Sequence, residues 1–120
     1  MSKSVLPWIP DRGEMIWIDF TPHAGNEMAG RHPLLVLSTR AFNGKMGAVM
    51  GLSMTSKVHP HNPFQLKSPV GKFDPIFINT NQISTFDWRA RNAKPHPMGT
   101  LSTAALKPVL EHLNAILQLP

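Results

Sequence analysis

The chain has 120 residues, enough for one domain with a hydrophobic core but too few for two ordinary domains. Its 12 Lys and Arg against 7 Asp and Glu give a net charge of +5, which favours an anionic partner such as nucleic acid or an acidic protein. The absence of cysteine excludes disulfides, thiolate zinc sites and cysteine nucleophiles.

Neither an export signal nor a membrane span is indicated by the distribution of apolar residues. The N-terminal segment MSKSVLPWIPDRGE lacks the continuous apolar core of a signal peptide. No apolar run reaches the roughly 18 residues that a spanning helix needs. We therefore expect one cytoplasmic domain over residues 1–120, with no membrane partner.

The first half of the chain predicts short strands separated by turns, as in a small β-rich barrel. A first strand is expected at residues 15–20 (MIWIDF), because its apolar residues alternate. The loop TPHAGNEMAG follows, and it is longer than the usual hairpin connection of about two to five residues. Residues 34–37 and 48–55 predict two more strands, joined by a tight Asn-Gly turn in FNGKMG.

The second half predicts further strands and one helix. Short strands are expected at residues 64–66, 76–78 and 83–88, with loops at 57–63 and 67–75. Ser102 or Thr103 can cap an amphipathic C-terminal helix. Pro108 lacks the amide for an intrahelical bond, so either the first turn is kinked or the helix begins at Pro108. The apolar residues of this helix recur at helical spacing: Leu106, Val109, Leu110, Leu113, Ile116 and Leu117.

Several common classes of functional site have no local signature here. There is no G-x-G-x-x-G fingerprint, no Walker motif and no G-x-S-x-G nucleophile elbow. His59 and His61 lie two residues apart in a proline-rich loop, and His96 is also flanked by prolines. A metal site is conceivable, but neither a third local ligand nor a nearby carboxylate completes it, so solvated histidines are the favoured interpretation.

Two groups of residues are candidates for binding an anion. The segment STFDWRARNAKPHP combines base stacking with phosphate neutralisation, because its aromatic residues Phe86 and Trp88 are interleaved with the basic residues Arg89, Arg91 and Lys94. A buried Trp88 followed by a solvated basic turn fits this pattern equally well. Arg31 and His32 point to opposite faces if a strand has already begun, whereas a turn at Gly30 and Pro33 would direct both toward the long loop.

The order of motifs resembles that of the MazF/PemK toxin family. The resemblance rests on RGEMIWIDF, GNEMAGRHPLLVLS, FNGKMGAVMGLSMTS, NQI and DWRAR, followed by the terminal helix. It implies a mainly β, SH3-like barrel of the CcdB/PemK type and a homodimer whose interface includes the helix. It also implies a cofactor-free and metal-independent endoribonuclease that cleaves single-stranded RNA, and an acidic antitoxin that binds the same groove.

The resemblance assigns site residues with two departures from the family pattern. The catalytic arginine of the G-x-R-P motif is replaced by His32, and Arg31 stands one place early. A loop glutamate corresponds to Glu27. An acidic-Gln pair corresponds to Asn81 and Gln82, so an amide replaces a carboxylate. The catalytic threonine and a second hydroxyl correspond to the adjacent pair Thr55 and Ser56.

The resemblance implies attack of a ribose 2′-hydroxyl on the adjacent phosphate, which needs a base, an acid and charge stabilisation. Histidine has an unperturbed pKa of about 6.5 and can exchange protons, whereas arginine stays charged. Our hypothesis is that His32 transfers protons, that Arg31 or Arg89 supplies fixed charge, and that Thr55 bonds the phosphate. The alternatives are a weakly active or inactive homologue that binds RNA or antitoxin, and, less favoured, a gyrase poison like CcdB.

Overall fold

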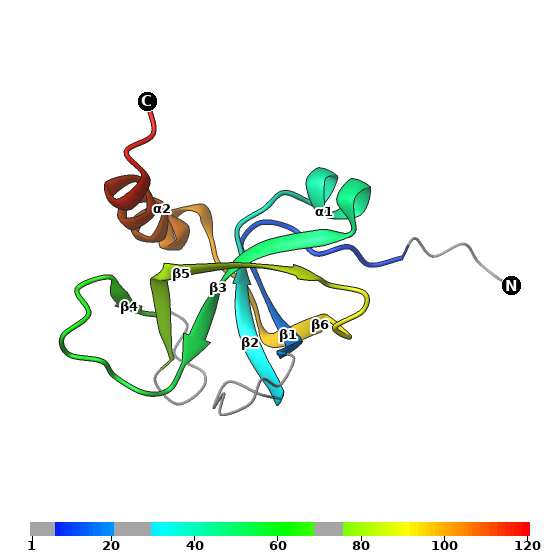
Figure 1. Ribbon diagram of the computed structural model, residues 1–120, viewed down its shortest axis with the longest axis horizontal. Coiled ribbons are helices and arrows are strands. Elements are labelled where there is room, and N and C mark those ends of the chain that lie inside the picture. The colour runs from blue at the N-terminus through cyan, green and yellow to red at the C-terminus, as the bar shows by residue number, and fades with distance from the viewer. Residues whose placement is uncertain (1–6, 21–29, 69–75) are drawn as a thin grey trace, which may run out of the picture.

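The computed structural model describes residues 7–20, 30–68 and 76–120. Within these ranges, six strands form one antiparallel sheet in the order β4-β5-β3-β2-β1-β6, and Figure 1 shows that this sheet curls. The elements in chain order are β1 (Glu14–Phe20), β2 (Gly30–Val36), α1 (Arg40–Met46), β3 (Ala48–Thr55), β4 (Gln65–Lys67), β5 (Phe77–Asp87), β6 (Lys94–Thr100) and α2 (Thr103–Leu117). The predicted mainly β fold with a C-terminal helix is confirmed.

Each face of the curled sheet carries a hydrophobic core. Successive residues of the central strands alternate between the two cores, so these strands are apolar on both faces. The core on the α2 side consists of Met15, Leu35, Leu52, Met54, Ile78, Met98, Leu101, Leu106, Val109 and Leu113. The core on the other side consists of Ile16, Ile18, Leu34, Val36, Val49 and Trp88, with Trp8 and Ile9 packed against it.

Helix α2 packs its apolar stripe against β5, as Figure 1 shows at one end of the sheet. The Ser102 hydroxyl accepts the Ala105 amide hydrogen at 3.1 Å, which confirms the predicted N-cap. The helix begins at Thr103 and continues through Pro108, so the alternative of a start at Pro108 is wrong.

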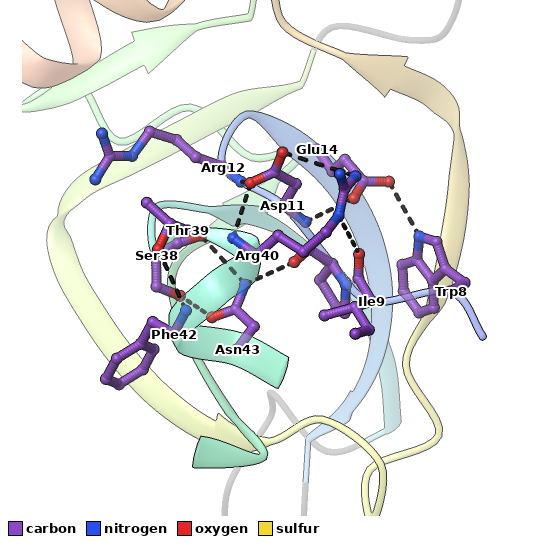
Figure 2. Close-up of polar contacts among 11 residues, drawn as sticks. Trp8, Ile9, Asp11, Arg12, Glu14, Ser38, Thr39, Arg40, Phe42 and Asn43 are labelled. Atoms are coloured by element: carbon purple, nitrogen blue, oxygen red, sulfur yellow. Dashed lines mark hydrogen bonds and ion pairs between the residues drawn. The ribbon is translucent and has the colours of Figure 1, made fainter. Parts of the chain in front are cut away.

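The tight Asn-Gly turn predicted in FNGKMG is wrong, because these residues belong to α1. Thr39 caps the helix by accepting the Phe42 amide hydrogen at 3.3 Å, and Gly47 ends it in the left-handed conformation at φ +65°. Asn43 is fully buried and lies among the N-terminal segment and the Ser38–Thr39 turn (Figure 2). Its amide donates to the carbonyls of Pro10 at 2.8 Å and Ser38 at 3.1 Å.

The strand predictions for the second half need two corrections. The strands expected at 76–78 and 83–88 form one strand, β5, because two polar residues between them, Asn79 and Thr80, are buried and hydrogen-bonded. Thr80 donates to the Phe64 carbonyl, and Asn79 donates to the Ser53 hydroxyl at 3.1 Å. Strand β6 was not predicted, because Pro95 and Pro97 interrupt its pattern. Prolines are tolerated there because β6 is an edge strand of the described sheet.

The remaining strand bounds agree closely with expectation except at β2. Strand β3 has the predicted bounds, β1 begins one residue earlier than predicted, and β4 is shifted by one residue toward the C-terminus. Strand β2 begins at Gly30, four residues earlier than predicted, and so includes Arg31 and His32. Because both residues lie within the strand, their side chains must point to opposite faces of the sheet.

Candidate active site

Arg31 and His32 lie inside β2 and point to opposite faces of the sheet, which settles the two alternatives left by the sequence. The His32 ring is half-buried and meets Phe20 edge to face, with 5.4 Å between ring centroids. The Arg31 guanidinium lies 4.3 Å from the centroid of Trp17 on the other face. The two residues therefore serve different surfaces.

A cleft of about 540 Å³ opens where β2 and β3 cease to pair. The two strands are hydrogen-bonded at residues 34–36 of β2. Among the described residues, the earlier part of β2 pairs with β1, whereas Met54 and Thr55 of β3 pair with β5. The volume lies within the range of about 300–1,000 Å³ typical of small-ligand sites. The lining residues are His32, Pro33, Met54, Thr55, Ser56, Lys57, His59, Ile76, Asn79 and Gln82.

Four of the residues predicted for the site meet in this cleft. They are His32, Thr55, Ser56 and Gln82. Asn81, the neighbour of Gln82, is exposed instead and accepts a hydrogen bond from the Asn62 amide at 3.0 Å. Glu27 lies outside the described residues.

The base-stacking role predicted for Trp88 is wrong, because the indole belongs to the core. Trp88 is 5% exposed, and its Nε1 donates to the Asn43 carbonyl at 2.9 Å. The alternative weighed from the sequence, a buried tryptophan followed by an exposed basic turn, fits this placement. The exposed Arg89 guanidinium lies 4.2 Å from the Trp88 ring centroid.

Neither arginine proposed to carry the fixed charge lines the cleft. Arg31 is on the other face of β2. Arg89 follows the end of β5 that pairs with Ala48, whereas Thr55 pairs with Phe77 at the opposite end of β3. Seven residues at about 3.3 Å each place these ends of β3 roughly 23 Å apart. Among the described residues that line the cleft, Lys57 is the permanent cation.

Thr55 is oriented by the backbone of the loop that follows β3. Its Oγ1 accepts the Lys57 amide hydrogen at 3.1 Å. The hydroxyl hydrogen of Thr55 remains available, because a hydroxyl both donates and accepts. Thr55 can therefore donate a hydrogen bond to an anionic ligand in the cleft.

The amide side chain of Gln65 braces the loop that carries Lys57 and His59. Its Oε1 accepts the His59 amide hydrogen at 2.7 Å, and its Nε2 donates to the Lys57 carbonyl at 3.0 Å. The same Nε2 also donates to Asn79 Oδ1 at 3.1 Å, which ties the loop to β5. These contacts hold residues 57–59 beside the cleft.

The Asn79 side chain extends this network beneath the cleft. Its Nδ2 donates to the Ser53 hydroxyl at 3.1 Å, and that hydroxyl donates to Gln82 Oε1 at 3.0 Å. Lys57, His59 and Asn79 were not predicted as site residues. The sequence offered one signal, the Thr-Ser-Lys run after a strand, in which a threonine hydroxyl can bond a backbone amide two residues later.

The described residues contain no group of three or more His, Cys, Asp or Glu side chains arranged to hold a metal ion. The same part of the chain contains no helix long and apolar enough to cross a membrane.

His96 lies on the same face as Arg31 and packs against Trp17, with 4.2 Å between ring centroids. Its Nδ1 accepts the Met98 amide hydrogen at 3.0 Å, which is possible while that nitrogen carries no proton. Burial, and secondarily the positive charge of Arg31, lower the pKa of His96 below its ordinary value of 6.5. Folding therefore favours the neutral imidazole.

Acidification is expected to destabilise the chain through His96. As the pH falls through 6.5, the unfolded chain binds a proton at His96 before the folded chain does, so stability decreases until the folded form also protonates. Urea unfolding at pH about 8 and about 5.5 measures this loss. His96→Asn removes the titration and keeps an acceptor, so it should lose less stability between the two pH values. An equal loss would contradict the assignment.

Comparison with known proteins agrees with the fold. Residues 11–117 match the family described as "PemK-like, MazF-like toxin of type II toxin-antitoxin system". The Endoribonuclease toxin MazF of Escherichia coli (strain K12) is 30% identical over 113 residues, which cover 94% of this chain and 98% of that protein.

Two solved structures from Deinococcus radiodurans are similar over nearly the whole chain. A crystal structure of MazF has a TM-score of 0.79 at 31% identity, covering 94% of this chain and 100% of the other. A chain of a MazE-MazF crystal structure has a TM-score of 0.80 at 30% identity, with the same coverage. The family match spans the strands that form the cleft. The chain belongs to the family of PemK-like, MazF-like toxins of type II toxin-antitoxin systems.

Proposed function

We propose that this chain is an endoribonuclease toxin that cleaves single-stranded RNA in the cleft between β2 and β3. The observation that carries the proposal is the meeting of His32, Thr55 and Lys57 around one cleft. An imidazole, a hydroxyl and an ammonium suit a phosphodiester, which needs proton transfer, hydrogen bonding and charge neutralisation. Relatives named endoribonuclease support the same reaction class.

The reaction begins when the ribose 2′-hydroxyl attacks the adjacent phosphorus. His32 accepts the 2′-hydroxyl proton, the bond from phosphorus to the 5′ oxygen breaks, and the 5′ oxygen takes up a proton from an acid. The products are a 2′,3′-cyclic phosphate and a 5′-hydroxyl. Lys57 stabilises the charge on the phosphate, in place of the arginines expected from the sequence. Thr55 donates a hydrogen bond to a phosphate oxygen. The substrate supplies its own nucleophile, so these side chains act without a metal or cofactor.

An acidic antitoxin segment is the proposed protein partner of the same cleft. The net charge of +5 favours anionic partners, and the similar Deinococcus chain was crystallised as MazE-MazF. We further propose a homodimer that uses the exposed apolar side chains of α2, among them Leu110, Ile116 and Leu117. The cytoplasm is the proposed place of action, since single-stranded mRNA is accessible there.

Incubation of the purified protein with mixed-sequence RNA in EDTA tests the function. New ends that carry a 2′,3′-cyclic phosphate are expected for the metal-independent enzyme. A gel shift of the RNA without cleavage would instead support the binding-module alternative. Intact, unshifted RNA would reject both.

Thr55→Val is expected to slow cleavage by about 100-fold or more, because it removes the hydroxyl that bonds the phosphate and keeps the side-chain shape. Thr55→Ser keeps the hydroxyl and should retain most of the activity. The measurement is kcat/KM on one cleaved oligonucleotide. Equal rates for wild type and Thr55→Val would remove Thr55 from the reaction.

A further inference from the structure

We propose that His59 is the acid of this reaction and donates a proton to the leaving 5′ oxygen, as the partner of His32. This inference rests on the proposed endoribonuclease function of the cleft. Cleavage of a phosphodiester by its 2′-hydroxyl needs one group that removes a proton and another that supplies one. Histidine can do either near neutral pH, and general acid or base catalysis is worth about 100- to 10,000-fold each.

The two histidines approach the cleft from separate walls. His32 belongs to β2, whereas His59 follows the end of β3, and the cleft lies where these strands no longer pair. In phosphoryl transfer the attacking and leaving oxygens lie roughly in line on opposite sides of phosphorus. A base on one wall and an acid on the other match this requirement.

His59 is held at the cleft although its side chain is exposed. Gln65 bonds both the His59 amide and the Lys57 carbonyl, at 2.7 and 3.0 Å, so one side chain fixes the loop on either side of Val58. Gln65 is itself bonded to Asn79, a buried residue of β5. This bracing supplies the fixed backbone position that a proton donor needs.

The proton balance of the step is complete with these two residues. Neutral His32 takes the 2′-hydroxyl proton as the new bond from the 2′ oxygen to phosphorus forms. Protonated His59 gives its proton to the 5′ oxygen as the bond from phosphorus to that oxygen breaks. The enzyme is left with a charged His32 and a neutral His59. Proton exchange with water restores both for the next turnover.

His61 offers a matched control on the same loop. It is exposed, like His59, but it is not among the described residues that line the cleft. The substitutions His59→Ala and His61→Ala therefore make the same chemical change two residues apart. Substitutions at exposed positions of this kind usually change stability little, so both variants should fold.

An RNA oligonucleotide with sulfur in place of the leaving 5′ oxygen identifies the acid, because a thiolate leaves without a proton. On the ordinary oligonucleotide, His59→Ala should cleave about 100-fold or more slowly than wild type, and His61→Ala should match wild type. On the sulfur substrate, His59→Ala should come within a few-fold of wild type. His32→Ala should stay slow on both, because the base is still missing.

Two results would overturn the assignment of His59. A wild-type rate for His59→Ala on the ordinary oligonucleotide would mean that it takes no part. An equal loss on both substrates would mean that it serves binding rather than protonation of the leaving group. If wild type left the ordinary oligonucleotide intact, the endoribonuclease proposal itself would fail, which is a different outcome from either of these.

Discussion

His32→Ala is expected to lower kcat/KM for RNA cleavage by about 100- to 10,000-fold, the usual contribution of a general base. The imidazole lines the cleft that also holds Thr55 and Lys57, and no described cation other than Lys57 has a permanent charge there to compensate. The rate of cleavage of one oligonucleotide by wild type and by His32→Ala, at the same pH, measures this loss.

Arg31→Ala is the matched control, because Arg31 is the adjacent residue on the opposite face of β2. Its guanidinium packs on Trp17, outside the cleft, and we expect less than a 10-fold change from the loss of an exposed charge. A large loss in Arg31→Ala together with an unchanged rate in His32→Ala would reverse the assignment. The fixed charge expected from the family pattern would then belong to Arg31 after all.

Local patterns in the sequence predicted the elements that depend on local chemistry. The alternating pattern at residues 48–55 predicted the observed bounds of β3. The Ser102 hydroxyl predicted where α2 begins. The family resemblance placed His32 and Thr55 among the site residues, and both line the cleft. Predicting the two strands did not show that His32 and Thr55 line the same cleft, because this depends on where β2 and β3 stop pairing.

Contacts between distant residues account for what the sequence did not predict. His59 and Lys57 are held by Gln65, six and eight residues away, and Gln65 is held by Asn79, fourteen residues further on. No propensity rule links side-chain amides to backbone groups at such separations. The orientation of the Arg31 side chain could not be predicted either, because it depends on where β2 begins.

The helix α1 is the clearest case of tertiary contacts that override a turn signal. Asn-Gly favours a two-residue hairpin turn. The Asn43 side chain instead bonds the Pro10 carbonyl, 33 residues away, and the Ser38 hydroxyl donates to its Oδ1 at 2.5 Å. Figure 2 shows how these bonds join α1 to the N-terminal segment. The helix is therefore stabilised by partners that lie outside any local window.

Asn43→Ala is accordingly expected to lower the free energy of unfolding by about 3 kcal/mol, because it leaves the buried Pro10 carbonyl unpaired and removes two bonds to Ser38. That is a large part of the roughly 5–15 kcal/mol typical of a domain. Urea unfolding measures the change, with Asn81→Ala as the control. Asn81 is exposed and bonds Asn62, so its loss should cost less than about 1 kcal/mol. Equal small losses in the two variants would mean that water or a rearranged Ser38 replaces the Asn43 amide, and that the helix does not depend on it.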